Sequence, residues 1–374
     1  MKQHCYLNCA ASVWPRPQQV TEAVLRAMTQ PPAEPSRSSS SAASPADACR
    51  HGLASLLGCA EEELFFTSGA TESANLIISG LDLEGAHVIA TASEHNCVLR
   101  PLYNHPSHPA VSIAPCDEDG RVILSELEAL IRPETRYLFL NHCSNVTGCL
   151  QDLPKISRLV RAHGIRLIAD VSQSIGIFPI DARDADILFF AGHKNLFGPT
   201  GIGGFCLRGG MPLKITKTGG TGSDSLWLKL PDGYRGREPG TPNLHGLAGL
   251  SAGVDHIRGI GTDMICASLR QRREALVSAL SAIRGVRVFH PAAEEAAAPI
   301  VSFLCEGLTP SDLSYILAES YGITLRSGYH CCPLLSDCLH APLGTARASF
   351  SLLTPTEDLE RLTEAVREIM EGIA

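Results

Sequence analysis

Residues 64 to 208 alternate short apolar runs with stretches whose apolar residues recur at helical spacing. Such runs, bounded by turn residues, are typical of strands that are buried on both faces. The runs are Leu64–Thr67, Val88–Ala92, Val111–Ala114, Tyr137–Asn141, Arg166–Asp170, Ile187–Ala191 and Gly203–Leu207. Because parallel strands are joined by crossover helices that cover the sheet, the pattern predicts an α/β fold with a mainly parallel, seven-stranded sheet.

A second, smaller region follows this predicted sheet. Residues 209 to 240 are glycine-rich and irregular, and a long helical pattern then runs from Thr262 to Ile283. Beyond it, strand-like and helical patterns alternate again. We expect a large domain at residues 13–250, and a smaller C-terminal α/β domain made of residues 1–12 and 251–374.

The composition excludes two classes of protein. The chain has 374 residues and a formal net charge of −8, whereas nucleic-acid binders need a concentrated basic face. No apolar run approaches the roughly 20 residues that cross a bilayer, and the start lacks a signal-peptide pattern. We expect a cytoplasmic protein with no nucleic-acid or membrane partner. Its 14 cysteines are expected to be mostly buried rather than disulfide-bonded.

Polar clusters follow five of the predicted strands. They are Ser68–Thr71, Glu94–Asn96, Asn145, Asp170 and Gly192–Lys194. Ligands of open α/β sheets bind beyond the carboxyl ends of the strands. We therefore expect these clusters to meet in one site.

Lys194 and Asp170 offer the most specific chemistry in these clusters. A lysine in a rigid turn can form a Schiff base with an aldehyde cofactor, although alone it also fits a surface loop. An aspartate that ends an apolar strand is costly unless it meets a cation. A pyridinium nitrogen is such a cation, and a helix N-cap is the alternative. Gln173, three residues later, is placed to donate to the phenolic oxygen of the same ring.

The turn Ser68–Thr71 leads into a predicted helix. Backbone N–H groups at a helix N-terminus bind phosphate readily, but such turns are common. His95 could stack on a coenzyme ring and shuttle protons, whereas a lone histidine is more often structural. The order of phosphate turn, histidine, asparagine, aspartate and lysine favours a pyridoxal-phosphate site.

Short segments over nearly the whole chain resemble one family. They are Tyr6–Ser12, Phe66–Asn75, Ser93–Asn96, Ser144–Gly148, Asp170–Gln173, Gly192–Lys194 and Glu238–Asn243. In them the chain resembles the class V aminotransferase family of fold-type I pyridoxal-phosphate enzymes, and within it the cysteine desulfurase and selenocysteine lyase branch. The resemblance implies the fold of a fold-type I PLP-dependent transferase and pyridoxal 5'-phosphate as cofactor.

The resemblance also implies roles for individual residues. Lys194 would carry the coenzyme as a Schiff base, and Asp170 would pair with its ring nitrogen. Gln173 and Asn145 would address the phenolic oxygen, and His95 would stack on the ring. The phosphate would be held by residues from both subunits of a homodimer: Ala70, Thr71 and His193, with Thr241 reaching in from the partner subunit.

The segment from Arg326 onward resembles the part of these enzymes that bears the sulfur-accepting cysteine, which places that role on Cys331. The short loop resembles that of the type II group, which includes selenocysteine lyases. The neighbouring cations Arg326 and His330 would favour the thiolate. Arg347 would bind the substrate carboxylate through its guanidinium fork, with Arg326 and Asn145 beside it.

Two plainer interpretations of this segment stay open. One is a zinc site formed by Cys331, Cys332, Cys338, His330 and His340, although the spacing fits no common zinc module and we expect no metal. The other is that Cys331 is merely a buried thiol. The role of Cys332 is open as well.

The expected function is that of a cysteine desulfurase, a PLP-dependent sulfurtransferase that converts L-cysteine to L-alanine and carries the sulfur as a persulfide on Cys331. A selenocysteine lyase or a cysteine/cystine C–S lyase on the same scaffold is the alternative. A catalytically idle sulfur-relay or partner-binding scaffold is an alternative of a different class. The sulfur acceptor is not identified by the sequence.

The chain departs from the family pattern at several positions. Asn8-Cys9 stands where the family usually has Asp-Asn, and Ala191 stands where a hydroxyl residue is usual ahead of the lysine. Loss of one neutral hydrogen bond to the phosphate would cost about 1 kcal/mol. These departures affect the expected substrate more than the expected fold.

Overall fold

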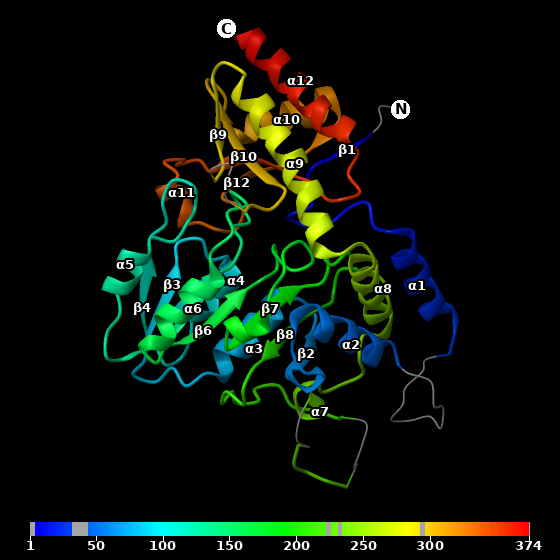
Figure 1. Cartoon of the computed structure of the whole chain (residues 1–374), viewed down its shortest axis with the longest axis vertical. Coiled ribbons are helices and arrows are strands. Elements are labelled where there is room, and N and C mark those ends of the chain that lie inside the picture. The colour runs from blue at the N-terminus through cyan, green and yellow to red at the C-terminus, as the bar shows by residue number, and fades with distance from the viewer. Residues whose placement is uncertain (1–3, 32–43, 222–225, 231–233, 292–295, 374) are drawn as a thin grey trace.

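The structure is a computed structural model that describes residues 4–31, 44–221, 226–230, 234–291 and 296–373. Its centre is a seven-stranded sheet of order β2-β8-β7-β6-β5-β3-β4 (Figure 1). The strands are β2 (Leu64–Thr67), β3 (His87–Thr91), β4 (Ala110–Ala114), β5 (Thr135–Asn141), β6 (Arg166–Asp170), β7 (Ile187–Ala191) and β8 (Gly203–Leu207). The predicted α/β fold with a mainly parallel, seven-stranded sheet is confirmed.

Strand β8 runs antiparallel to both of its neighbours, β7 and β2. The connection from β7 to β8 covers residues 192 to 202 and contains no helix. Strands joined without a crossover helix pair antiparallel, so this short connection reverses the chain at the carboxyl end of β7. Lys194 lies in this connection and is thereby held at the sheet edge where the parallel strands end.

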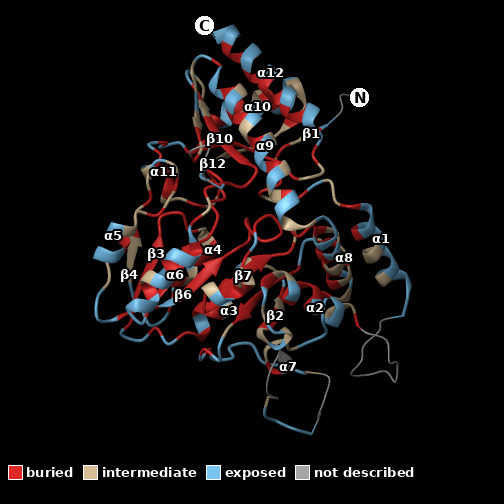
Figure 2. Ribbon diagram, viewed as in Figure 1, coloured by how far each residue is buried: buried red, intermediate tan, exposed pale blue. Residues whose placement is uncertain are grey.

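Helices cover both faces of the large sheet, and its strands are mostly buried (Figure 2). Val88 and Ala90 of β3 belong to a hydrophobic cluster with α3 and α4, whereas Ile89 between them belongs to the core on the other face. This alternation follows from the two-residue period of a strand. The helices around the sheet are α1 (Gln18–Thr29), α2 (Pro45–Leu57), α3 (Ala70–Gly80), α4 (Asn96–Tyr103), α5 (Leu124–Ala129), α6 (Leu153–Ala162), α7 (Tyr234–Arg237) and α8 (Leu244–Ile260), with short 3₁₀ turns η1 (Glu61–Glu63) and η2 (Ala182–Asp184).

A smaller antiparallel sheet of order β12-β13-β10-β9 is built from the C-terminal third of the chain. Its strands are β9 (Val286–Phe289), β10 (Ile300–Cys305), β12 (Arg326–Gly328) and β13 (Thr345–Ser349). The helices beside it are α9 (Thr262–Ser281), α10 (Pro310–Tyr321), α11 (Leu335–Cys338) and α12 (Thr356–Ile373). In the part of the chain described above, no helix is long and apolar enough to cross a membrane.

The N-terminal strand lies with the C-terminal part of the chain. β1 (Cys5–Tyr6) pairs in parallel with β11 (Ile323–Thr324). The chain leaves the large sheet through α8 and turns at Gly261, whose φ of 88° favours glycine, into α9. Helix α8 spans the boundary expected at residue 250, and the division into two domains stays a prediction.

Candidate active site

A cavity of about 310 Å³ opens where the parallel strands of the large sheet end. Its lining comes from the turns after β2, β3, β5, β6 and β7, from the N-terminal segment, and from β12 and β13 of the small sheet. Most of the residues singled out in the sequence line it, namely Ala70, Thr71, His95, Asn145, Asp170, Gln173, His193, Lys194, Arg326, His330 and Arg347. The expectation that the strand-end clusters meet in one place is confirmed by this geometry.

Asp170 and Lys194 form the polar centre of the cavity. Asp170 ends β6 at only 7% exposure, and its Oδ1 accepts a hydrogen bond from the Ser172 N–H at 2.9 Å. Burial raises the pKa of Asp170, and the positive charge of Lys194 opposes this effect. Burial in turn lowers the pKa of Lys194. A lysine whose pKa is lowered supplies the free amine that Schiff-base chemistry requires.

His95 and His193 bring two neutral imidazoles to the cavity. His95 caps α4, and its Nδ1 accepts from the Cys97 N–H at 3.0 Å, so the neutral ring carries its proton on Nε2. Burial, followed by the charge of Lys194, lowers the pKa of both His95 and His193 to about 4. The Nδ1 atom of His193 is buried without a hydrogen-bond partner. Both rings are therefore uncharged at neutral pH.

The turn before α3 lies against the start of β8. A Cβ on Gly203 would approach the Cα of Gly69 to 2.6 Å, and Gly69 itself has a φ of 150°. Glycine at both positions lets the strand run directly against the turn. The first N–H groups of α3 have no partner within the helix, and Ala70 and Thr71 place that end of the helix on the cavity wall.

Asn145 and Gln173 connect the cavity to other segments. The Asn145 side-chain nitrogen donates to the His330 carbonyl at 2.8 Å, and its Oδ1 is buried without a partner. The Gln173 side-chain nitrogen donates to the Ala10 carbonyl at 2.9 Å. Both side chains thus tie distant parts of the chain to the site, and their contact with a phenolic oxygen stays a prediction.

Arg347 is a buried cation on the cavity wall. It is 1% exposed, donates to the Asn145 carbonyl at 2.6 Å and to Asn8 Oδ1 at 3.1 Å, and leaves its Nε without a partner. Burial, followed by the charge of Arg326, lowers its pKa to about 9. Asn8 is neutral where the family usually carries an aspartate. Within the described ranges, no carboxylate forms an ion pair with Arg347, so its charge is available to an anionic ligand.

Cys331 is not among the residues that line this cavity. It lines a neighbouring cavity of about 470 Å³ that shares Thr71, His95 and Cys97 with the first. The Nη2 group of Arg326 donates to the Cys331 sulfur at 3.0 Å. Cys331 is half-exposed, so the interpretation of a merely buried thiol is wrong.

The backbone of the Cys331 loop is strained and firmly held. His330 and Cys331 both have left-handed φ angles, 52° and 60°, which cost roughly 1–2 kcal/mol each for residues other than glycine. The Asn96 N–H donates to the Cys331 carbonyl at 2.8 Å, and Asn145 holds the His330 carbonyl. The His330 Nε2 lies 3.1 Å from the Thr345 carbonyl. These contacts fix the position of the sulfur.

In the described part of the chain, the neighbours of Cys331 form neither a cationic histidine nor a cluster of metal ligands. His330 was expected to be a cation, but burial and the charge of Arg347 lower its pKa well below the ordinary value, so that expectation is wrong. The cysteines and histidines of the alternative zinc site do not gather; within the described residues, the one metal-like group is Cys59, Glu63 and Cys206. Thr241 is exposed and does not line this cavity.

Glu94 and Cys97 were not assigned a role from the sequence. Glu94 is buried behind the site, and burial raises its pKa to about 8. Its Oε1 accepts from Thr91 Oγ1 at 2.6 Å and from the Asn141 N–H, which ties the ends of β3 and β5 together. Cys97 lines both cavities. The sequence feature that could have identified them is their position close to His95, just after the end of a predicted strand.

A profile of the family described as aminotransferase class-V matches residues 5–362. The chain belongs to the class-V aminotransferase family. It is 30% identical to a probable cysteine desulfurase of Methanothermobacter thermautotrophicus, over 99% of this chain and 95% of that protein. A probable cysteine desulfurase of Xylella fastidiosa is 32% identical over 86% of this chain and 80% of its own length.

Solved structures of two cysteine desulfurases share the fold over nearly the whole chain. The apo cysteine desulfurase of Thermococcus onnurineus superposes with a TM-score of 0.90 at 27% identity, over 99% of this chain and 95% of that one. The S-sulfonic acid form of the cysteine desulfurase CsdA of Escherichia coli gives 0.88 at 26% identity, with the same coverage of 99% and 95%. The expected fold-type I PLP-dependent transferase is thereby confirmed.

Pyridoxal 5'-phosphate is the cofactor of this family, and the cavity suits it. The cavity lining contains a helix N-terminus for the phosphate, a buried carboxylate for the ring nitrogen and a lysine for the aldehyde. The unpartnered Nδ1 of His193 and Oδ1 of Asn145 are buried polar atoms that lack a ligand from the chain. Such atoms are costly unless a ligand satisfies them, so the residues present fit the group.

Proposed function

We propose that the protein is a cysteine desulfurase that takes the sulfur of L-cysteine onto Cys331. The observation that carries the proposal is the contact between the Cys331 sulfur and Arg326, because Arg326 also lines the cavity that holds Lys194 and Asp170. A thiol that merely packs would not need a cation shared with the cofactor cavity. The names of the relatives support the same activity.

The side chains around the cavity divide the work of binding and proton transfer. Pyridoxal phosphate supplies an electron sink for the Cα of the bound amino acid. Asp170 would hold the ring nitrogen of the coenzyme in its protonated form, and the Lys194 Nζ would take the proton from Cα. The guanidinium of Arg347 receives the substrate carboxylate, which gives its buried charge the partner that the chain itself does not supply.

Cys331 then accepts the sulfur. Its sulfur, which accepts a hydrogen bond from the Arg326 guanidinium, attacks the substrate sulfur as the thiolate. The bond between Cβ and sulfur breaks, and its electron pair stays with the three-carbon fragment, which takes up protons and leaves as L-alanine. The new S–S bond leaves a persulfide on Cys331, so that L-cysteine and the Cys331 thiol give L-alanine and the persulfide.

The cavity next to Cys331 suits the hand-over of the persulfide. Cys331 and Arg100 line it, whereas Lys194 does not. A sulfur-acceptor protein, for example in iron–sulfur cluster assembly, can bring a thiol to Cys331 there without entering the cofactor cavity.

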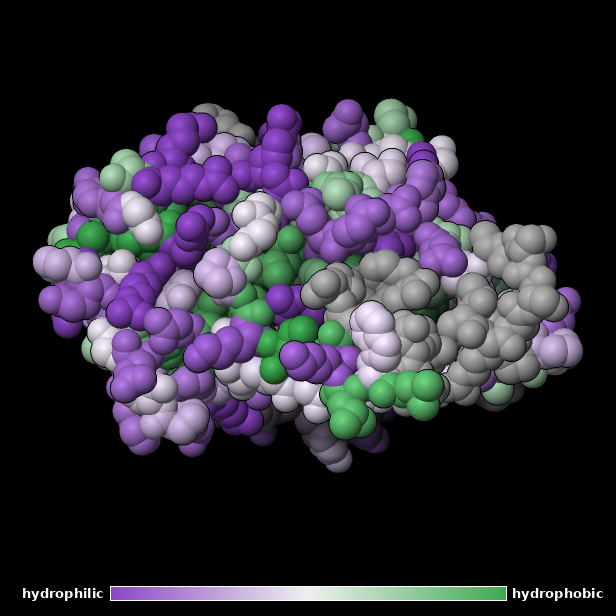
Figure 3. Space-filling model, turned by 90° about the horizontal axis from the view of Figure 1, so that it is seen from below, coloured by the Kyte–Doolittle hydropathy of each residue, from purple (hydrophilic) through white to green (hydrophobic). Residues whose placement is uncertain are grey.

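A homodimer is part of the proposal. Thr241, expected at the phosphate of the partner subunit, is exposed and outside this chain's own cavity. Nearby in the sequence, Leu226 is 95% exposed and Trp227 is 69% exposed, and hydrophobic side chains are visible on the face seen from below (Figure 3). Large apolar side chains that are exposed together mark protein–protein contact sites. Sedimentation of the pure protein tests this part.

The test of the proposal is the yield of L-alanine from L-cysteine, measured with and without a reductant that removes persulfide. The wild-type protein is expected to form one alanine per chain without reductant and to turn over with it. Cys331→Ala is expected to form none, and Cys338→Ala, which removes another half-exposed thiol, serves as the control. Full alanine release by Cys331→Ala would contradict the proposal and favour a C–S lyase.

Two further measurements separate the remaining alternatives. Parallel assays with L-selenocysteine show a selenocysteine lyase as a large rate preference for that substrate. Reduction with borohydride followed by peptide mapping is expected to find the coenzyme on Lys194. Absence of that modified peptide would favour an idle scaffold.

A further inference from the structure

A second cluster of metal-ligating side chains lies away from the proposed active site. Cys59 follows α2, Glu63 ends η1, and Cys206 lies in β8. The pairing of Leu64 with Cys206 brings these three segments together, because β2 begins directly after Glu63. The two sulfur atoms and a carboxylate oxygen of Glu63 all lie within 4.8 Å of one another. None of the three residues lines the active-site cavity.

We propose that Cys59, Cys206 and Glu63 bind a thiophilic divalent cation such as Zn²⁺. Two sulfur ligands and one oxygen ligand are a donor set that zinc accepts, with bonds of about 2.3 Å to sulfur and 2.0–2.2 Å to oxygen. A tetrahedral ion with these bonds places its two sulfur atoms about 3.8 Å apart. Because the ligand atoms lie within 4.8 Å of one another, they are at most about 1 Å beyond this separation, and water fills the fourth position.

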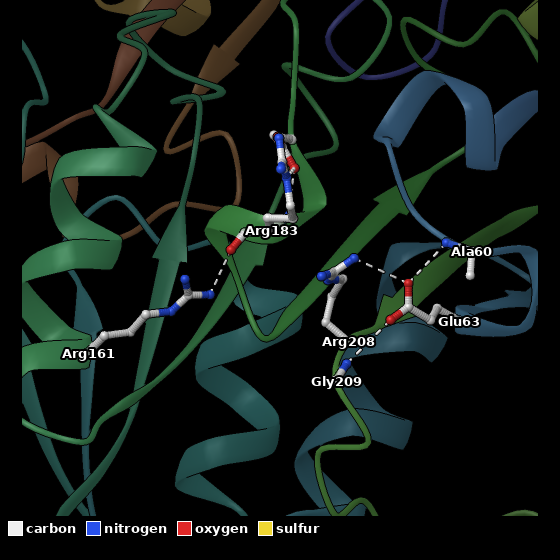
Figure 4. Close-up of polar contacts among 7 residues, drawn as sticks. Ala60, Glu63, Arg161, Arg183, Arg208 and Gly209 are labelled. Atoms are coloured by element: carbon white, nitrogen blue, oxygen red, sulfur yellow. Dashed lines mark hydrogen bonds and ion pairs between the residues drawn. The ribbon is translucent and has the colours of Figure 1, made fainter.

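The carboxylate of Glu63 is already held in place by its surroundings. Its Oε2 accepts from the Ala60 N–H at 3.0 Å and from Arg208 Nη1 at 3.3 Å, and its Oε1 accepts from the Gly209 N–H at 3.3 Å (Figure 4). Hydrogen bonds of this kind orient the ligands of metal sites. Glu63 therefore loses little side-chain freedom when a cation binds.

The charges of the cluster favour a divalent cation. Two thiolates and the Glu63 carboxylate carry three negative charges, and Arg208 next to them carries one positive charge. A divalent cation brings the total to zero, which matters because Cys206 is fully buried. The hydrogen bond between the two thiols lowers the pKa of Cys59 and, together with burial, raises the pKa of Cys206, so the Cys206 thiol keeps its proton until a cation displaces it. Binding then releases the remaining thiol protons to solvent.

The position of the cluster predicts a structural role for the ion. It joins the end of α2 to the outer strands β2 and β8, while Cys59 and Glu63 are half-exposed and give the ion a path from solvent. An ion that binds only the folded chain stabilises it. We expect Zn²⁺ to raise the midpoint of thermal unfolding without changing the absorbance of the coenzyme.

The test uses the full chain in its Cys331→Ala form, fully reduced, so that the reactive thiol does not bind metal. Equilibrium dialysis is expected to find one Zn²⁺ per chain, and Co²⁺ is expected to give thiolate-to-cobalt charge-transfer bands. Cys59→Ser and Glu63→Gln should each weaken binding at least tenfold, and Cys266→Ser, another half-exposed cysteine, should not.

The proposal is overturned by either of two results. One is that the reduced chain does not bind Zn²⁺ stoichiometrically. This result overturns the proposal also where the unreduced chain holds a Cys59–Cys206 disulfide. The other is unchanged binding in a folded Cys59→Ser variant. Since the readouts are metal content and cobalt spectra, the result does not depend on the desulfurase activity.

Discussion

Arg326 on β12 lies directly opposite Arg347 on β13 in the antiparallel pairing of these strands. Like charges that face each other across a sheet destabilise it, and the charge of Arg326 contributes to the lowered pKa of Arg347. The two guanidinium groups contact different partners, because Arg326 reaches the Cys331 sulfur and Arg347 reaches Asn145 and Asn8. Arg326 thus provides a cation for the Cys331 thiolate, and Arg347 provides one for the substrate carboxylate.

The first prediction concerns Arg347. Arg347→Lys keeps the charge but loses the bidentate contact with the substrate carboxylate, which is worth about 2 kcal/mol, or roughly a 30-fold loss in kcat/KM for L-cysteine. Steady-state kinetics measures the loss. Cysteamine, which has no carboxylate, should be turned over equally well by the variant and the wild type. An equal loss with both substrates would show that Arg347 does not bind the carboxylate.

The second prediction concerns the contact between Arg326 and Cys331. Arg326→Gln removes a charged hydrogen bond to the sulfur and should slow alkylation of Cys331 by iodoacetamide at neutral pH about tenfold. Mass spectrometry of the Cys331 peptide follows the reaction. Arg100→Gln is the matched control, since Arg100 lines the same cavity as Cys331 without a hydrogen bond to its sulfur. Equal rates in all three proteins would contradict the role of Arg326.

The third prediction concerns the strained loop. Asn145→Ala removes the bond to the His330 carbonyl, so the left-handed backbone at His330 and Cys331 loses one of its anchors. Loss of a neutral bond of about 1 kcal/mol should slow single-turnover persulfide formation roughly fivefold, measured at saturating coenzyme because Asn145 is also expected to contact the phenolic oxygen. Asn96→Ala should have little effect, because Asn96 holds Cys331 through its backbone N–H. Slowing by both variants alike would point to a general disturbance.

The fourth prediction concerns Glu94 and the pH dependence of stability. Burial raises its pKa from 4.5 to about 8 in the folded chain. The folded state therefore holds a proton that the unfolded state releases, and the contribution of Glu94 to stability is present below pH 4.5 and lost as the pH rises toward 8. Glu94→Gln keeps an oxygen acceptor without the charge. Its free energy of unfolding should fall less than that of the wild type between these pH values.

Urea denaturation of both proteins at several pH values in this window measures the difference. Glu274→Gln is the control, since Glu274 lies on the exposed face of α9, where it pairs with Arg270, and the same chemical change there shows how much any glutamate-to-glutamine substitution alters the curves. Parallel curves for the wild type and Glu94→Gln would show that Glu94 is not protonated in the folded chain.

Much of the fold and the site could be predicted because both rest on local patterns. The period of the apolar residues set the strands of the large sheet, and each strand end carried its own polar residue. Asp170 ends a strand, and Lys194 and His95 lie in the turns that follow two others, so the parallel order of these strands brings them together without further information. The conformation of each turn is encoded within a few residues.

The remaining features depend on contacts between residues that are distant in the sequence. The neutral state of His330 follows from its burial, and the bond from Asn145 to the His330 carbonyl joins residues 185 positions apart. Cys59 lies next to Cys206 because β2, the outermost strand of the large sheet, pairs antiparallel with its neighbour β8. Burial, charge state and such pairings are properties of the packed chain. The sequence alone therefore determined which residues could act, and the tertiary structure decided which of them are charged, held and within reach of one another.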